Sequence, residues 1–204
     1  MEIVERENTH AVLADKVKRL IRVGEELPEM VLQSRLSSIG FFEFDEIFTD
    51  ECWQAITRLR ETIQDESDIF ICPVKPDAAH FLKFWSNYGD LIYPGIEQRS
   101  ALWDAQFDQP DKYPQDEMIL CMNQLVVSSM DERWAIWADR DLGVALIGVM
   151  QDVLKKNEIL GFFEAVEISI VTAETAAKNF IANNFAHQVL PEGFEEKIRV
   201  AYGS

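Results

Sequence analysis

Three short apolar runs follow one another in the sequence LCMNQLVVSSMDERWAIWADRDLGVALIGVM, which begins at Leu120. The runs cover Leu120 to Val127, Arg133 to Ala138 and Gly143 to Val149. Runs of this length that are rich in valine, isoleucine, leucine and tryptophan, and bounded by turn-forming residues, are typical of β-strands. The segments between them have the length of hairpin loops. The sequence therefore predicts an antiparallel meander of three strands.

The middle strand of this meander has apolar side chains on both faces. Trp134 and Ile136 point to one side of the strand. Ala135 and Trp137 point to the other side, because side chains alternate along a strand. A strand with two apolar faces is covered on both sides, so we expect it to be central. The run from Gly143 to Met150 is too short to cross a bilayer, which takes about 20 residues in a helix.

Helices are predicted on both sides of the meander in the chain. Thr49 is a good N-cap, and Trp53 and Leu59 belong to an apolar stripe on the helix that follows it. Asp77 is expected to cap a further helix. Pro28 can open a helix that runs through Leu36.

The predicted fold class is α+β, with a mostly antiparallel sheet centred on the meander at about residues 120–149 and covered by helices. The alternative is an α/β mixed sheet, because strand and helix alternate from Phe41 to Tyr93. A clean alternation from Val166 to Ile170 predicts one more strand. We expect a single compact domain over residues 1–204, with 1–40 as a helical N-terminal extension packed on it.

The chain is strongly acidic, with 36 Asp and Glu residues against 19 Lys and Arg residues and a net charge of −17. Binding to a phosphate backbone or an anionic membrane needs the opposite sign, so neither nucleic acid nor membrane is an expected partner. The charge favours a basic protein partner. Acidity also keeps many soluble proteins soluble, which is the alternative explanation of the same composition.

Nothing at the N-terminus resembles a cleaved secretion signal, because the charged residues 1–7 are not followed by an apolar segment. Cys52, Cys72 and Cys121 are odd in number and widely spaced, which argues against a disulfide framework or a cysteine-based zinc site. We therefore expect buried thiols and a cytoplasmic protein.

No catalytic motif stands out. The three histidines are scattered, and the phosphate-binding, dinucleotide-binding, G-x-S-x-G and H-E-x-x-H patterns are absent. Asp77 and His80 share a helix face, but two ligands do not make a metal site, and an N-cap explains the aspartate. Carboxylate pairs such as Glu43 with Asp45 are too common in this chain to single one out. The sequence argues against an enzyme and indicates no metal or cofactor.

The segment from Pro94 to Glu117 has no sustained period and is predicted to be a long loop. Such loops are uncommon in compact domains and tend to be functional. Its acidic and aromatic side chains alternate, which is the composition of an interface. The residues that we assign to partner binding are Glu97, Trp103, Asp104, Phe107, Asp108, Asp111 and Tyr113.

These observations together predict a non-catalytic acidic binding protein for a basic protein partner, for example an immunity or antitoxin-type inhibitor of a cationic toxin or nuclease. One alternative is a small hydrolase or transferase whose acidic catalytic residues come from distant parts of the chain. Another is a structural subunit of a bacterial assembly.

Overall fold

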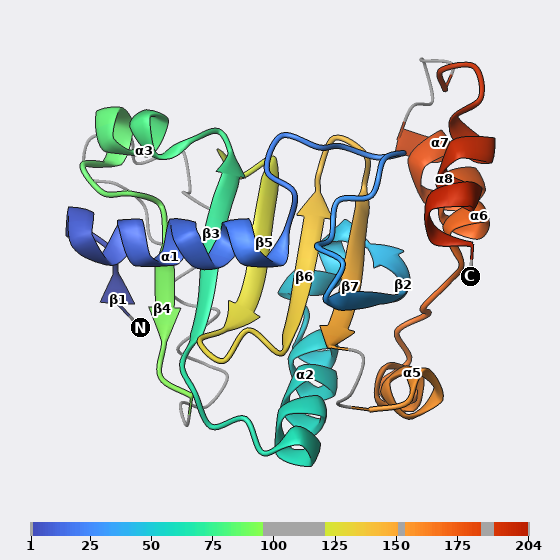
Figure 1. Ribbon diagram of the computed structural model, residues 1–204, viewed down its shortest axis with the longest axis horizontal. Helices are drawn as coiled ribbons and strands as arrows, with labels where there is room; N and C mark the ends of the chain where they lie inside the picture. The colour runs from blue at the N-terminus through green and yellow to red at the C-terminus, as the bar shows by residue number, and fades with distance from the viewer. Residues whose placement is uncertain (1, 96–120, 151–153, 185–189, 204) are drawn as a thin grey trace.

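A seven-stranded sheet runs through the centre of the computed structural model, which describes residues 2–95, 121–150, 154–184 and 190–203 (Figure 1). Its strand order is β1-β4-β3-β5-β6-β7-β2, and every neighbouring pair is antiparallel. The predicted α+β class is therefore confirmed, and the α/β alternative is wrong. The strands are β1 (Glu2–Ile3), β2 (Leu36–Glu43), β3 (Ile69–Lys75), β4 (Leu91–Tyr93), β5 (Gln124–Ser129), β6 (Trp134–Asp139) and β7 (Val144–Met150).

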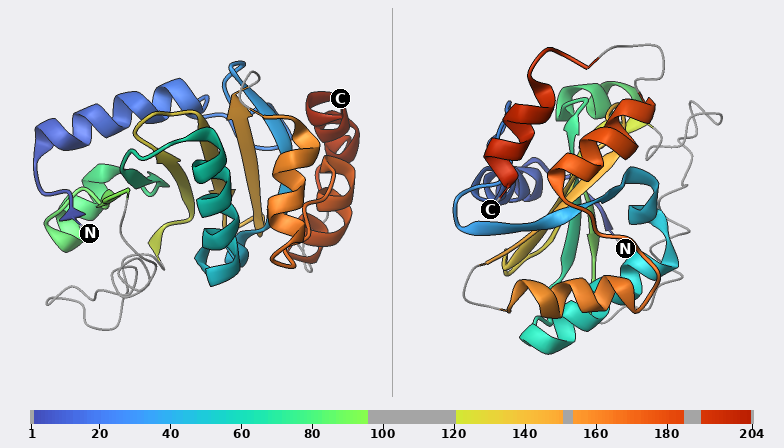
Figure 2. Two further views of the ribbon diagram at one scale, coloured as in Figure 1. Left: turned by 90° about the horizontal axis from the view of Figure 1, so that it is seen from below. Right: turned by 90° about the vertical axis from the view of Figure 1, so that its right-hand side faces the viewer.

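Helices cover both faces of the sheet, and Figure 2 shows α1 and α2 on opposite sides of it. One core lies under η1, α2 and α5, and the other lies under α1 and the helices from α6 to α8. Among the described residues, no helix is both long and apolar enough to cross a membrane. The helical segments are α1 (Glu7–Leu20), η1 (Phe44–Phe48), α2 (Asp50–Ile63), α3 (Ala78–Trp85), α5 (Lys156–Glu164), α6 (Ala173–Ala176), η3 (Ala177–Ile181), α7 (Ala182–Asn184) and α8 (Phe194–Tyr202).

The predicted meander is the centre of the sheet. Strand β6 pairs with β5 on one side and with β7 on the other, and all six of its residues are buried. Trp134 and Ile136 face the core under α2, whereas Ala135 and Trp137 face the core under α1. The predicted alternation of faces is therefore confirmed. Both faces are apolar because a layer of helices packs on each side of the sheet.

Both predicted caps are also confirmed. The backbone N–H of Cys52 donates to the Thr49 hydroxyl at 3.2 Å, and the N–H of His80 donates to the Asp77 carboxylate at the same distance. These bonds satisfy amide groups that have no partner inside their helices.

The helix predicted from Pro28 to Leu36 is wrong. Residues 28–35 make turns, Leu32 bridges to Ile21, and Leu36 is already the first residue of β2. The backbone N–H of Val31 donates to the Tyr202 hydroxyl at 2.8 Å instead of to a helical carbonyl. Partners elsewhere in the fold thus take the hydrogen bonds that a helix would have made.

The strand predicted from Val166 to Ile170 is also wrong. This segment crosses the outer edge of β2 between α5 and α6, as the right-hand view of Figure 2 shows, and the one bridge described there joins Val171 to Phe41. Val166 and Ile168 are buried against the core, which explains their alternation. Two of the described hollows lie along β2, one at Glu43 and the other at Ile39, Gly40 and Phe41.

Candidate functional site

The predicted binding loop cannot be placed, because Glu97, Trp103, Asp104, Phe107, Asp108, Asp111 and Tyr113 all lie outside the described residues. The chain that follows this loop is described. There, the backbone N–H of Arg140 donates to the carbonyl oxygen of Asn123 at 2.7 Å. The chain from Cys121 onward therefore lies beside the β6–β7 turn.

A polar hollow of about 480 Å³ opens beside this same turn. Its walls come from the end of β2 and η1, from the turn itself, and from η3 and α7. The lining residues are Glu43, Phe44, Asp45, Arg140, Gly143, Asn179, Phe180, Asn183 and Asn184. Residues distant in the sequence meet here because β2 pairs with β7, which places Glu43 opposite Val144.

Helix η3 is a π-helix, and it contributes Asn179 and Phe180 to the hollow. Such widened turns are rare and are frequent at functional sites. The side chain of Asn183 donates to the carbonyl oxygen of Asn179, which links the π-helical turn to α7. Three asparagines at positions 179, 183 and 184 are a signal that the sequence contained and that our motif search missed.

Carboxylates without an ion pair among the described residues surround the hollow. Glu43 and Asp45 are exposed and line it, and Asp141 is exposed in the adjacent turn. Burial lowers the pKa of the Arg140 guanidinium, and Asp45 and Asp141 lie close enough to oppose this effect. The same guanidinium lies 5.1 Å from the centre of the Phe44 ring.

The acidic surface continues from this hollow into α2. Five carboxylates occur between Glu43 and Glu51, and no Lys or Arg interrupts them. Glu43, Asp45 and Glu51 are exposed, and Glu46 is half-buried. The carboxylate pair of Glu43 and Asp45, which the sequence alone could not single out, thus stands at the edge of a polar hollow.

At the opposite end of the sheet, a carboxylate is bound by several cations. Glu132, in the β5–β6 turn, is bound by Lys16 at 2.9 Å, by Arg19 at 2.6 Å and by Arg35 at 2.7 Å. Burial alone would raise the pKa of Glu132, but the hydrogen bonds from these three cations lower it to about 2. This carboxylate has a structural role, because its charge is already compensated inside the protein.

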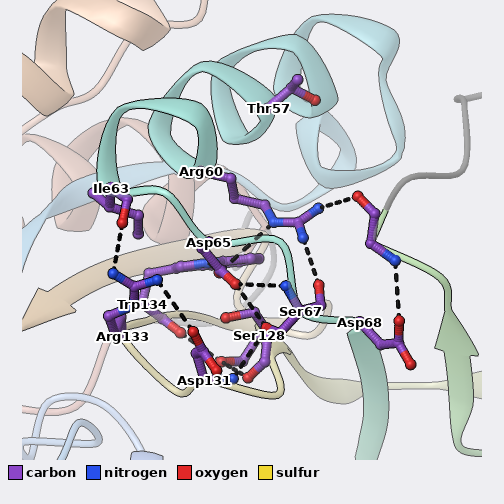
Figure 3. A network of polar contacts seen from close by, with 12 residues as sticks. Thr57, Arg60, Ile63, Asp65, Ser67, Asp68, Ser128, Asp131, Arg133 and Trp134 are labelled. Atoms are coloured by element: carbon purple, nitrogen blue, oxygen red, sulfur yellow. Dashed lines mark hydrogen bonds and ion pairs between the residues drawn. The ribbon is translucent and has the colours of Figure 1, made fainter.

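A second network fills the same end of the sheet (Figure 3). The indole N–H of Trp134 donates to the Asp65 carboxylate at 3.1 Å, and Arg60 donates to the carbonyl oxygen of Ser67 at 2.5 Å. Arg133 donates to backbone carbonyl oxygens at the C-terminal end of α2. These bonds join α2 to β6 and to the segment that leads into β3.

One further cluster contains catalytic residue types without a catalytic arrangement. The Asp90 carboxylate, 2% exposed, lies 2.6 Å from Nδ1 of His10 and accepts a hydrogen bond from the Cys72 thiol. Burial raises the pKa of Cys72 well above its ordinary value. The carboxylate separates the thiol from the imidazole, whereas a nucleophile needs its base beside it. The cluster instead anchors α1 to the start of β4.

The polar hollow has the chemistry of a binding site. None of its described lining residues is a histidine, cysteine, serine or lysine. Its carboxylates and amides can accept hydrogen bonds from ammonium or guanidinium groups, and its aromatic rings can contact their apolar stems.

Comparison with known proteins gives no assignment, since no family model matches the chain and no curated protein or solved structure matches it significantly.

Proposed function

We propose that this protein is a non-catalytic binding protein that recognises a basic protein partner through the polar hollow and the acidic run from residue 43 to residue 51. The observation that carries the proposal is the set of exposed carboxylates without ion pairs beside the hollow. Some acidic side chains elsewhere, such as Glu132, Asp65 and Glu196, are instead paired with neighbouring cations.

A charged surface of this kind acts mainly on the rate of association. Carboxylates at the rim of an interface attract a cationic partner before contact and make the association rate sensitive to salt. The hollow then offers acceptors that fix the orientation of a lysine or arginine side chain. The net charge of −17 favours the same class of partner.

An inhibitor of the immunity or antitoxin type, which neutralises a cationic toxin or nuclease by covering its surface, fits this chemistry best. Such a protein needs a preformed acidic surface and no catalytic residues of its own. We also assign the protein to the cytoplasm, because Cys52 and Cys72 are buried free thiols.

The proposal is tested by capturing the partner from the source cell and measuring its binding kinetics at several salt concentrations. One variant replaces the carboxylates of the acidic run by amides, at Glu43, Asp45, Glu46 and Glu51. The matched control makes the same charge change at exposed positions elsewhere, namely Glu164, Glu167, Glu192 and Glu195.

We expect the first variant to lower the association rate roughly tenfold at low salt and to flatten its salt dependence. The control should change both much less, because its charges lie outside the interface. If the two variants have equal effects, the acidic run acts only through the overall charge of the protein and is not part of the interface. A captured partner without a basic surface would contradict the proposal as a whole.

A further inference from the structure

The second hollow along the β2 edge has a different character from the first. It has a volume of about 430 Å³ and lies between α5 and α8. Its base is formed by Ile39, Gly40 and Phe41 of β2. A volume of this size is within the range of small-molecule sites, roughly 300–1,000 Å³.

Apolar side chains from both cores meet in this hollow. Leu160 and Ile170 pack against the core under α2, whereas Val171 packs against the core under α1. All three are only partly buried and line the hollow. The apolar surface in the hollow is therefore covered by neither layer of helices.

Cations stand at the rim of this apolar hollow, which is unusual in a chain with so few of them. Lys156, the first residue of α5, lines the hollow, is exposed and makes no ion pair within the described residues. Arg199 lines the opposite side, but it is already bound to Glu196 at 2.6 Å.

The one lining carboxylate is not available to a ligand cation. Glu174 is bound to Lys178 at 2.6 Å, and this hydrogen bond and charge lower the pKa of Glu174. The Tyr202 hydroxyl is also occupied, because it donates to the carbonyl oxygen of Glu29 at 3.0 Å and accepts from Val31. The ring of Tyr202 therefore adds apolar wall, and Lys156 is the lining cation for which no ion pair is described.

We propose that this hollow binds an amphiphilic anion, a small molecule with an aliphatic or aromatic body and a carboxylate or phosphate head. The body lies against Leu160, Ile170 and Val171, and the head lies at the ammonium group of Lys156. The site is separate from the acidic surface proposed for the protein partner, so either proposal can fail without the other.

The test is a titration of the full chain followed by amide chemical shifts in NMR. Octanoate, octyl phosphate, octan-1-ol and octylammonium share one chain and differ in the head group. We expect octanoate or octyl phosphate to shift the amides of Leu160, Ile170 to Thr172 and Gly203, and to bind roughly tenfold more tightly than octylammonium. Comparison of the two anions identifies which head group is preferred.

Three variants separate the contribution of the ligand's charged head group from that of its apolar body. Lys156→Glu should weaken binding of the anion roughly tenfold and leave octan-1-ol unchanged. Lys155→Glu is the matched control, because this exposed neighbour does not line the hollow, and it should leave both affinities unchanged. Leu160→Gln should weaken the anion and the alcohol alike. Thermal melts establish that each variant is folded.

The proposal is overturned if the anions shift no amides at the hollow, or if octylammonium binds as tightly as they do. Equal losses from Lys155→Glu and Lys156→Glu would also overturn it, because the effect would then come from overall charge.

Discussion

Trp134 combines full burial with a buried hydrogen bond. It is fully buried in the central strand, and its indole N–H donates to the buried carboxylate of Asp65 at 3.1 Å. Removing it would leave both a cavity and an acceptor without its donor. We therefore expect Trp134→Ala to lower the free energy of unfolding by about 3–5 kcal/mol in a denaturant titration.

The variant Trp134→Phe separates these two contributions. It removes the donor to Asp65 but leaves a smaller cavity than alanine does, so it should cost less, about 1–3 kcal/mol. An unchanged denaturant midpoint in Trp134→Ala would mean that β6 is not the central strand.

Glu132 is the second residue for which the structure predicts a measurable effect, in this case of pH. Its pKa is lowered from 4.5 to about 2 in the folded protein, so its ion pairs stabilise the fold fully above pH 4.5. This stability is lost as the pH falls from 4.5 toward 2. We expect Glu132→Gln to lower the free energy of unfolding at pH 7 by about 3 kcal/mol and to flatten its decline in that acid range.

The control for this measurement is Glu61→Gln, since Glu61 is exposed on α2 and has no ion pair among the described residues. Stability as a function of pH should then follow the original protein. A decline equally steep in Glu132→Gln and in the original protein would contradict the role of the three cations.

Among the elements, β2 depends on the segment that crosses its edge. Gly40 lies under this segment, and a Cβ atom at that position would lie 2.9 Å from the carbonyl oxygen of Val171 and would overlap Ile170. The backbone bridge between Phe41 and Val171 cannot move away without losing its hydrogen bonds. We expect Gly40→Ala to cost about 1–3 kcal/mol in a denaturant titration.

For Gly161, in α5, we expect the opposite effect of alanine on the free energy of unfolding. A Cβ atom there would meet nothing within 4 Å, and alanine favours a helix over glycine. Gly161→Ala should therefore stabilise the protein by up to about 1 kcal/mol. If both glycines respond alike, the crossing segment does not pack on β2 as described.

At the scale of the whole molecule, charge is distributed unevenly between the two ends of the sheet. At the β5–β6 end three cations bind the single carboxylate of Glu132, whereas at the β6–β7 end Glu43, Asp45 and Asp141 are exposed and share one nearby cation, Arg140. The described chain that follows the predicted loop begins at Cys121, and Asn123 is hydrogen-bonded to Arg140 at this second end.

The role of the loop stays a prediction with separable parts. In binding kinetics with the captured partner, Trp103→Ala or Phe107→Ala should chiefly raise the dissociation rate, because aromatic anchors supply much of an interface's binding energy. Asp104→Asn combined with Asp108→Asn should instead lower the association rate and reduce its salt dependence. Unchanged rates in all these variants, with intact thermal melts, would remove the loop from the interface.

The sequence by itself determined the meander, the helix after Thr49 and the helix after Asp77. These elements are specified by features within a few residues of one another, namely alternating apolar runs between turns and capping side chains. Trp134 and Trp137 could be assigned to opposite faces for the same reason, since alternation is a local property of a strand. The acidic character of the surface was likewise evident from composition.

Only the tertiary structure decided the conformation of the segment before β2, the pairing of β2 and the path of the segment after α5. Residues 28–35 do not form the predicted helix, because Leu20, Arg22 and Tyr202 take backbone hydrogen bonds of this segment, and Leu36 pairs with Met150. The polar hollow exists because the pairing of β2 with β7 brings Glu43 and Asp45 to Arg140. Contacts between residues so far apart in the chain leave no local pattern, since their energy comes from packing that forms only when the sheet is complete.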